Sequence, residues 1–134
     1  MPLRARRASS QALVESALVF PLLILLSLGA LQVILYAHAR DVLISAAQEG
    51  ARLAAEDGRS LDEGLARCQA LITAGLGSSL EPVRLDGQRG PELVELQVDS
   101  ALRPIVPLPV AGGLPLHVSG HAARERFRPA GGAP

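Results

Sequence analysis

The longest apolar run in the chain covers residues 16–37 and contains no formally charged side chain. A helix that crosses a bilayer needs ~20 such residues. The run holds thirteen Leu, Ile, Val and Phe residues, which favour insertion by about 4–8 kcal/mol before penalties for polar groups. Pro21 lies near the start of the run, where a membrane helix tolerates it. The pattern predicts one transmembrane helix.

Helical periodicity continues beyond the apolar run, through residues 41–56. An apolar stripe at i, i+3, i+4, i+7 spacing indicates one buried helix face. It consists of Leu43, Ala46, Ala47, Gly50, Leu53 and Ala54. The stripe is built mainly from small residues, which allow another backbone to approach this helix face closely. Asp57-Gly58 marks the helix end.

A second helix is predicted to begin after Ser60. Ser60 and Glu63 form a capping box, and Gly75 and Gly77 signal the helix end. The face that this helix should bury consists of Leu61, Leu65, Cys68 and Ile72. Cys68 is most simply a small buried residue; the alternatives are an intermolecular disulfide or a reactive thiol.

The remainder of the chain alternates as β structure. We expect three strands, at residues 81–86, 92–99 and 114–123. A turn should lie around Gly87–Gly90, and the Pro-rich residues 103–113 cannot form a central strand. The predicted fold class is therefore α+β: a long N-terminal transmembrane helix extends into a small exported domain with a second helix and a short antiparallel sheet of about three strands.

These elements divide the chain into four parts. We expect a basic cytoplasmic leader at 1–10, the transmembrane helix and its extension at 11–56, a small α+β exported domain at 57–128 and a disordered tail at 129–134. Arginines at positions 4, 6 and 7 place the N-terminus inside by the positive-inside rule. The part after the apolar run is small, has a single aromatic residue, Phe127, and has no disulfide to compensate. We therefore expect its helix stripe to be completed by a partner or by the membrane helix's own extension.

Composition argues against several classes of function. The net charge is zero and only three residues are aromatic, which disfavours a nucleic-acid partner. His117 and His121 would lie ~13 Å apart along a strand, too far for one zinc ion. Neither a GxSxG nor a HExxH motif occurs. We predict no enzyme activity, no cofactor and no metal site.

The segment before the apolar run carries the most specific signal. A basic tail, a small residue, four further residues, Glu and a long apolar helix resemble the type IV prepilins. In that family a membrane peptidase cuts before the apolar segment, and Glu is the fifth residue of the mature chain. Here the resemblance makes Glu15 the fifth residue, Gln11 the first, and Ser10 the residue before the cut, where the family usually has Gly.

Within that group the chain resembles TadE-like proteins, the minor pseudopilins of tight-adherence (Flp) pilus systems. Two motifs at this spacing carry the resemblance, namely Gln11-Ala12-Leu13-Val14-Glu15-Ser16-Ala17-Leu18-Val19-Phe20-Pro21 and Ala46-Ala47-Gln48-Glu49-Gly50-Ala51-Arg52. It implies a minor pilin-like subunit in the cytoplasmic membrane, its partners being the lipid bilayer, other pilin-like subunits, the pilus assembly machinery and a prepilin peptidase. A hetero-oligomer is implied. Glu15 of one subunit would neutralise the Gln11 amino terminus of its neighbour and set the helix register. The resemblance thus implies that subunit packing involves Glu15, Pro21, Ala46, Gly50 and Leu53.

Other interpretations stay open on the residues alone. Glu15 can simply lie at the headgroup interface. The chain can be a bitopic accessory protein whose exported domain binds a partner. It can also be a secreted binding protein cleaved after Ala39, since Ala37-His38-Ala39 has the small-x-small form of a signal-peptidase site. The mature N-terminus distinguishes the pilin-like subunit, the bitopic accessory protein and the secreted binding protein.

Overall fold

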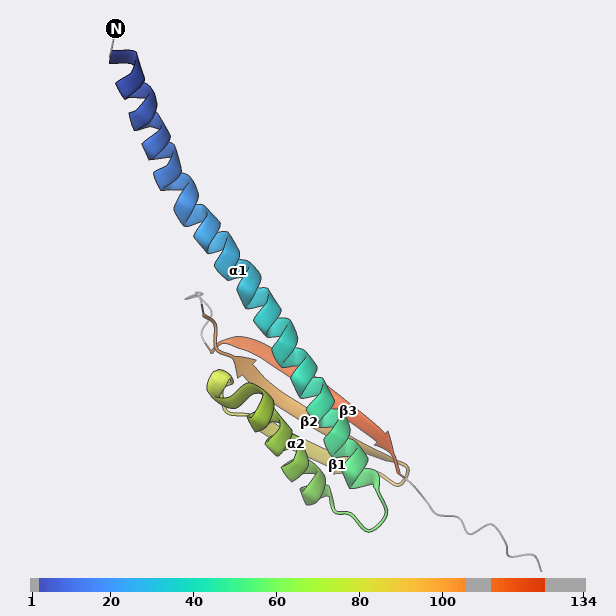
Figure 1. Cartoon of the computed structure of the whole chain (residues 1–134). Helices are drawn as coiled ribbons and strands as arrows, with labels where there is room; N and C mark the ends of the chain where they lie inside the picture. Colours follow the sequence, from blue (N-terminus) through green and yellow to red (C-terminus); the bar gives the residue numbers. More distant parts are fainter. Residues whose placement is uncertain (1–2, 106–111, 125–134) are drawn as a thin grey trace, which may run out of the picture.

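The computed structural model describes the backbone of residues 3–105 and 112–124, and side chains from Leu13 onward within those ranges. Its elements are α1 (Leu3–Ala55), α2 (Leu61–Leu76), a short 3-10 turn (Gly77–Ser79), β1 (Arg84–Arg89), β2 (Leu93–Leu102) and β3 (Leu114–Ala123). Figure 1 shows α1 as one long helix, with α2 and the sheet packed against its second half only. The predicted α+β fold class is confirmed.

The first helix runs for 53 residues without interruption, roughly 80 Å at 1.5 Å per residue. The predicted continuation of the apolar helix to about residue 56 is therefore confirmed. Pro21 lies inside the helix. The backbone helix also begins at Leu3, so it includes most of the segment that we expected to be a separate leader.

The second helix begins as its capping box predicts. Ser60 Oγ accepts a hydrogen bond from the Glu63 N–H at 3.2 Å, and a Glu63 carboxylate oxygen accepts one from the Ser60 N–H at 2.9 Å. This Ser60 N–H bond also lowers the pKa of the Glu63 carboxyl. Gly77 follows the helix at φ +53° and donates its N–H to the Thr73 carbonyl. Both predicted ends of α2 are thus confirmed.

The sheet is antiparallel in the order β1-β2-β3. The third strand has the predicted bounds, and the second extends three residues beyond them, to Leu102. The position predicted for the first strand was wrong, because β1 covers Arg84–Arg89 rather than 81–86. Gly90 closes the turn after β1 by donating its N–H to the Leu93 carbonyl at 2.8 Å. We had assigned Gly87 to a turn, but it pairs with Leu96 inside the ladder.

Gly87 explains why that interpretation failed. A Cβ at Gly87 would lie 3.0 Å from Leu61 Cδ1. The residue is therefore small because α2 passes close to the strand, and no turn is needed at that point. A glycine inside a strand often marks such a close approach.

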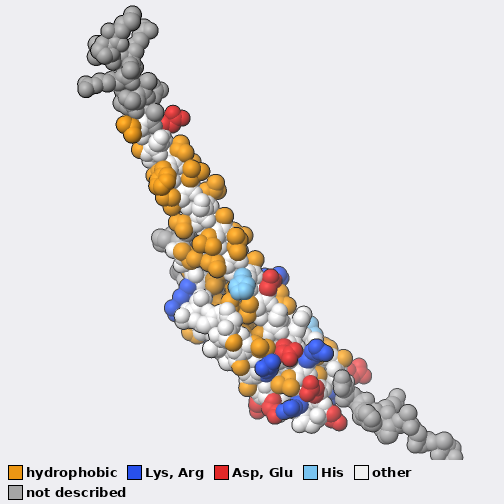
Figure 2. All heavy atoms as spheres, in the orientation of Figure 1, with side chains coloured by type: hydrophobic (Ala, Val, Ile, Leu, Met, Phe, Trp, Pro, Cys, Tyr) orange, Lys and Arg blue, Asp and Glu red, His pale blue; other side chains and the backbone are white. Residues whose placement is uncertain are grey.

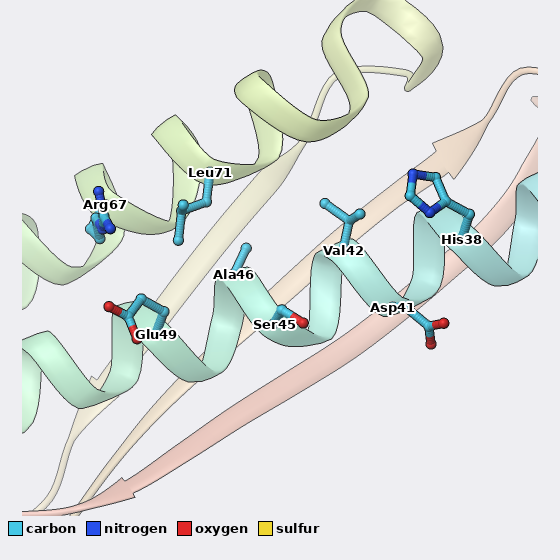
Figure 3. Close-up of a pocket in the computed structure, with 8 residues that line it drawn as sticks. All are labelled: His38, Asp41, Val42, Ser45, Ala46, Glu49, Arg67 and Leu71. Atoms are coloured by element: carbon cyan, nitrogen blue, oxygen red, sulfur yellow. The ribbon is translucent and has the colours of Figure 1, made fainter.

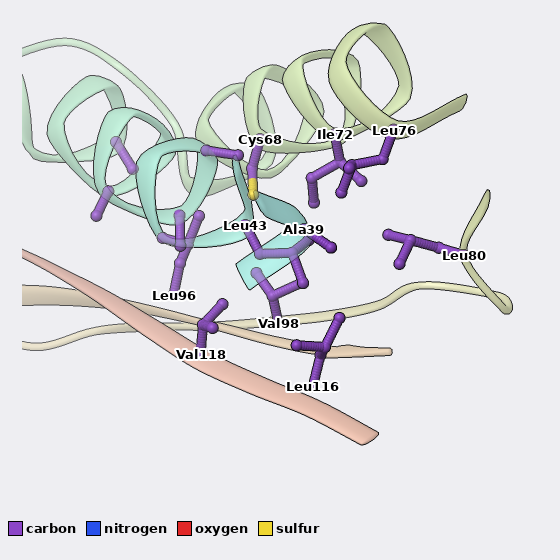
Figure 4. Close-up of a cluster of buried hydrophobic side chains, with 14 of the residues drawn as sticks. Ala39, Leu43, Cys68, Ile72, Leu76, Leu80, Leu96, Val98, Leu116 and Val118 are labelled. Carbon is purple, nitrogen blue, oxygen red and sulfur yellow. The ribbon is translucent and has the colours of Figure 1, made fainter. Parts of the chain in front are cut away.

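The two helices cover one face of the sheet, and the core lies between these layers. Figure 4 shows the buried side chains of α1 and α2 above those of β2 and β3. The largest fully buried ones are Leu43, Ile72, Leu96, Leu116, Val94, Val98 and Cys68. The second half of α1 completes this core, which was one of the two arrangements expected for the part of the chain after the apolar run. The opposite face of the sheet is polar and mostly exposed.

Three buried glycines allow backbones to come unusually close. A Cβ at Gly50 of α1 would lie 2.7 Å from the Gly64 carbonyl oxygen of α2, and one at Gly64 would lie 2.6 Å from the Gly50 carbonyl oxygen. A Cβ at Gly120 of β3 would overlap the Ala47 carbonyl of α1. Such contacts with backbone atoms cannot be relieved by a rotamer change, so glycine is required at each position.

Replacing Gly120 with alanine should therefore destabilise the domain. The added methyl group forces β3 away from α1, which should lower the free energy of unfolding by about 1–3 kcal/mol. Ser119→Ala is the matched control, because Ser119 lies next in β3 on the exposed face. Chemical unfolding of the detergent-solubilised full chain measures both variants. Equal stability of the Gly120→Ala and Ser119→Ala proteins would contradict the close packing described here.

Candidate membrane span and assembly site

The first half of α1 exposes nearly all of its large apolar side chains. Among the described residues, Leu18 is 72% exposed, Leu26 69% and Val33 68%. Figure 2 shows this apolar surface as a continuous band along the helix, while charged side chains gather on the far end of the domain. A core helix of a soluble domain would be covered. By length and composition, α1 is sufficient to cross a membrane.

Glu15 lies at the entrance of this apolar surface. It is exposed, and with Ser16, Val19, Phe20 and Leu23 it lines a shallow hollow on one helix face. The structure gives its carboxylate no hydrogen bond or ion pair within the described part of the chain. A carboxylate beside hydrocarbon must be paired, protonated or placed at the interface. The fold leaves Glu15 available for any of these.

The expected processing site lies at the edge of what the structure describes. The backbone of Ser10 and Gln11 belongs to α1, and their side chains lie outside the described residues. The bond between them is therefore in a helical segment, about one turn before Glu15. Cleavage at this bond stays a prediction.

Pro21 is exposed on the apolar half of α1. Proline has no N–H, so the carbonyl of Ala17 loses its usual helical donor. Six residues later, Ser27 Oγ donates to the Leu23 carbonyl at 2.8 Å, which satisfies its hydroxyl within the helix. No domain residue covers Pro21 in the described chain, so its surface is open to lipid or to another helix.

The other residues assigned to subunit packing lie within the chain's own fold. Ala46 is 1% exposed. Gly50 is buried where α1 meets Gly64 and Cys68 of α2, and Leu53 is half-buried. Packing within one subunit therefore accounts for the small size of Ala46 and Gly50. Of the five assigned residues, Glu15 and Pro21 are the two on the freely exposed surface.

A groove of about 500 Å³ runs between the outer sides of α1 and α2. In Figure 3, Arg67 and Leu71 of α2 face Ala46 and Glu49 of α1, and His38 lies at the other end of the groove. The groove carries both charge signs. In the described ranges no three His, Cys, Asp or Glu side chains gather in a metal-binding arrangement.

The two histidines of β3 lie on the exposed sheet face. His117 Nδ1 contacts an Asp99 carboxylate oxygen at 2.5 Å, and His121 Nε2 contacts Ser119 Oγ at 3.3 Å. The paired strands place Glu95 opposite His121. Each histidine thus has a polar neighbour at the surface, and the two do not converge on one point.

Two contacts at the end of the apolar run were missed by sequence reasoning. Gln32 is only 7% exposed, and its Oε1 accepts a hydrogen bond from the Ile105 N–H at 2.8 Å. One turn later, the Tyr36 hydroxyl donates to the Pro115 carbonyl at 3.1 Å. On sequence alone, Gln32 is only one of the polar groups that oppose insertion of the apolar run. A lone amide in an apolar helix is itself a signal of a specific partner.

Cys68 of α2 is fully buried and faces Gly50 of α1. Burial raises the pKa of its thiol to about 11 because the thiolate would lose its solvation. This agrees with the interpretation of Cys68 as a small core residue. A reactive or intermolecular thiol would need exposure and a lowered pKa.

Comparison with known proteins gives one family match. Residues 11–52 match the family model described as TadE-like protein, which confirms the TadE-like resemblance carried by the two motifs. The matched segment contains Glu15, the apolar run and the Ala-rich stretch up to Arg52. No curated protein and no solved structure matches the chain.

Cys68 should resist thiol reagents in the folded protein. At pH 8 a thiol with a pKa of about 11 is ionised in roughly one molecule in a thousand, and burial blocks access as well. Absorbance with an aromatic disulfide reagent measures the rate, before and after denaturation. Ser119→Cys in a Cys68→Ala background provides an exposed thiol as the control. Rapid native-state labelling of Cys68 would contradict its assignment to the core.

Proposed function

We propose that this chain, TadE-like over residues 11–52, is a minor pilin-like subunit that takes part in assembling a tight-adherence (Flp) pilus. The observation that carries the proposal is the division of α1. Its first half exposes large apolar side chains, and its second half is covered by a small domain of the same chain. A subunit of this shape keeps its helix free for lipid or for other helices.

The topology that fits best is N-in. The tail carries three arginines, whereas residues 38–57 carry two arginines and four acids. The positive-inside rule then holds residues 1–10 in the cytoplasm and exports the domain at 57–128. The subunit lies in the cytoplasmic membrane before assembly, and at the pilus base or in the fibre afterwards.

Of the residues assigned to subunit packing, Glu15 has the central role in this proposal. Cleavage between Ser10 and Gln11 would create an amino terminus about one helical turn from Glu15. In hydrocarbon, that positive charge needs a partner, and an exposed carboxylate on a neighbouring helix supplies one. Pairing between subunits would fix how far one helix is displaced along the next. Pro21, on the same exposed stretch, forms part of the packing surface.

The proposed partners follow from this arrangement. They are the bilayer, other pilin-like subunits, the assembly machinery and a prepilin peptidase acting at Ser10-Gln11. Different pilin-like chains would pack together in a hetero-oligomer. TadE-like proteins are generally not enzymes, and the role proposed here is structural.

An alternative function is a bitopic accessory protein that is never processed. The groove between α1 and α2, next to the end of the apolar run, favours this alternative because it offers the exported domain a place to bind a partner. In that case Glu15 would lie at the inner headgroup interface with no neighbour to pair with.

The mature N-terminus tests the proposal directly. Isolated from native membranes that contain the pilus machinery, the protein should begin at Gln11 by mass spectrometry. Ser10→Gly restores the usual residue before the cut and should be processed at least as completely. A mature chain that begins at Met1 or Pro2 would support the bitopic alternative, and one that begins at Arg40 would establish a secreted protein.

Glu15→Ala should separate insertion from assembly. Removing a carboxylate next to hydrocarbon does not weaken insertion, so the variant should stay in the membrane fraction. It should lose most of its incorporation into pili, because the neighbouring amino terminus keeps no partner. Glu56→Ala is the matched control, being an exposed acid at the far end of α1. Pilus incorporation of Glu15→Ala at the level of Glu56→Ala would exclude this role.

A further inference from the structure

We propose that the membrane-proximal end of the exported domain, formed by Pro104, Ile105 and Pro115 beside Tyr36, rests in the outer leaflet at the boundary between hydrocarbon and headgroups. The inference depends on the proposed membrane insertion of α1. It adds a second lipid contact, made by a part of the chain far from the apolar run. Its ligand is the bilayer surface itself.

The constant rise of α1 gives the depth of each of its residues in the bilayer. If the Glu15 carboxylate marks the inner edge of the hydrocarbon, ~30 Å of hydrocarbon at 1.5 Å per residue reaches about position 35. Gln32 is 17 residues from Glu15, or ~26 Å along the axis. The outward faces of α1 agree with this limit, because Val33 and Ile34 are still 68% and 63% exposed. Gln32 therefore lies within the outer leaflet.

The hydrogen bond from Ile105 to Gln32 brings the domain to the same depth. Gln32 is only 7% exposed, and its Oε1 accepts a hydrogen bond from the Ile105 N–H at 2.8 Å. A backbone N–H in hydrocarbon must have such a partner. The residue before it is Pro104, which has no N–H to satisfy. The side chain of Ile105 is 53% exposed, so it presents an apolar surface at lipid depth.

The surrounding residues have the chemistry of a membrane interface. Tyr36 is half-buried, and its hydroxyl bonds to the Pro115 carbonyl; tyrosine is enriched at this boundary. On α1, the first charged residues after the apolar run are Arg40 and Asp41, about one turn further out. Arg103 is exposed and paired with Glu81 at 3.3 Å, and its long side chain can reach the headgroups.

The far end of the domain is the natural reference point. Leu93 begins β2 at the end opposite Leu102 and is 47% exposed. Leu93 pairs with Ala123 of β3, which lies beside Arg52 and Ala55 of α1. Arg52 is some 24 Å beyond Tyr36 along the helix axis. Leu93 and Ile105 are thus exposed apolar residues in comparable settings at very different distances from the span. Figure 2 shows charged side chains gathered at the far end.

The chain contains no tryptophan, so a single tryptophan reports on one position. Three single variants of the full chain are needed: Ile105→Trp, Leu93→Trp and Ile34→Trp. Each is reconstituted in phosphatidylcholine vesicles with lipid in large excess over protein. Lipids brominated near the carboxyl end of the acyl chain quench tryptophan at the boundary. Ile105→Trp should be quenched at least about twofold more strongly than Leu93→Trp, with a blue-shifted emission, as befits an interfacial residue.

Ile34→Trp separates the failure of this inference from that of the proposed membrane function. If Ile34→Trp is quenched and Ile105→Trp behaves like Leu93→Trp, the domain stands clear of the lipid and the inference is overturned. If Ile105→Trp is blue-shifted but not quenched, protein covers it, and the inference fails as well. If Ile34→Trp also escapes quenching, α1 does not span the bilayer, and both proposals fall together.

Discussion

The fold depends on how closely the backbone of α1 approaches its neighbours. Gly50 meets Gly64 of α2, and the Ala47 carbonyl meets Gly120 of β3. With few aromatic residues and the lone Cys68 unpaired in the core, the domain cannot rely on bulky side chains or a covalent link. Short distances between backbones exclude water and bring Leu43, Leu96 and Val98 together instead. If α1 moved outward by one side-chain layer, this small core would open.

This constraint explains how side-chain size changes along α1. From Leu13 to Ile34 the exposed positions are mostly large and apolar, and from Ala39 to Ala55 the buried positions are mostly alanine. Lipid tails accommodate large side chains, whereas a crossing helix at close range does not. The TadE-like match at residues 11–52 covers the exposed apolar stretch of α1 and most of its buried Ala-rich stretch. Its Ala-rich part therefore has an explanation inside a single subunit. In the described part of the chain the fold gives no such packing role to Glu15 and Pro21 of the first motif.

Local signals in the sequence were sufficient where one interaction decides the structure. The Ser60–Glu63 capping box and the alternation of 114–123 each define an element through neighbouring residues. Periodicity identified the buried face of 41–56 but could not identify what buries it, since a stripe specifies a face and not its partner. Gly87 was assigned to a turn because only the fold places Leu61 against it. The role of Gln32 could not be predicted, because its hydrogen-bond partner, Ile105, lies 73 residues away in the sequence.

The hydrogen bond between Ile105 and Gln32 joins the apolar part of α1 to the segment that follows β2. Because α1 is one unbroken helix, Glu15 and Gln32 stay ~26 Å apart whatever the helix does as a body. In the proposed membrane arrangement, the Glu15 carboxylate opposes movement into the hydrocarbon from the inner side, and Ile105 is hydrogen-bonded to α1 near the outer boundary. Withdrawing α1 by one turn, ~5.4 Å, would carry Ile105 outward and bring Glu15 into the bilayer unpaired. Under the proposed function, a neighbouring amino terminus that neutralises Glu15 would remove the cost of burying an unpaired carboxylate. Pairing with another subunit and leaving the membrane would then favour one another.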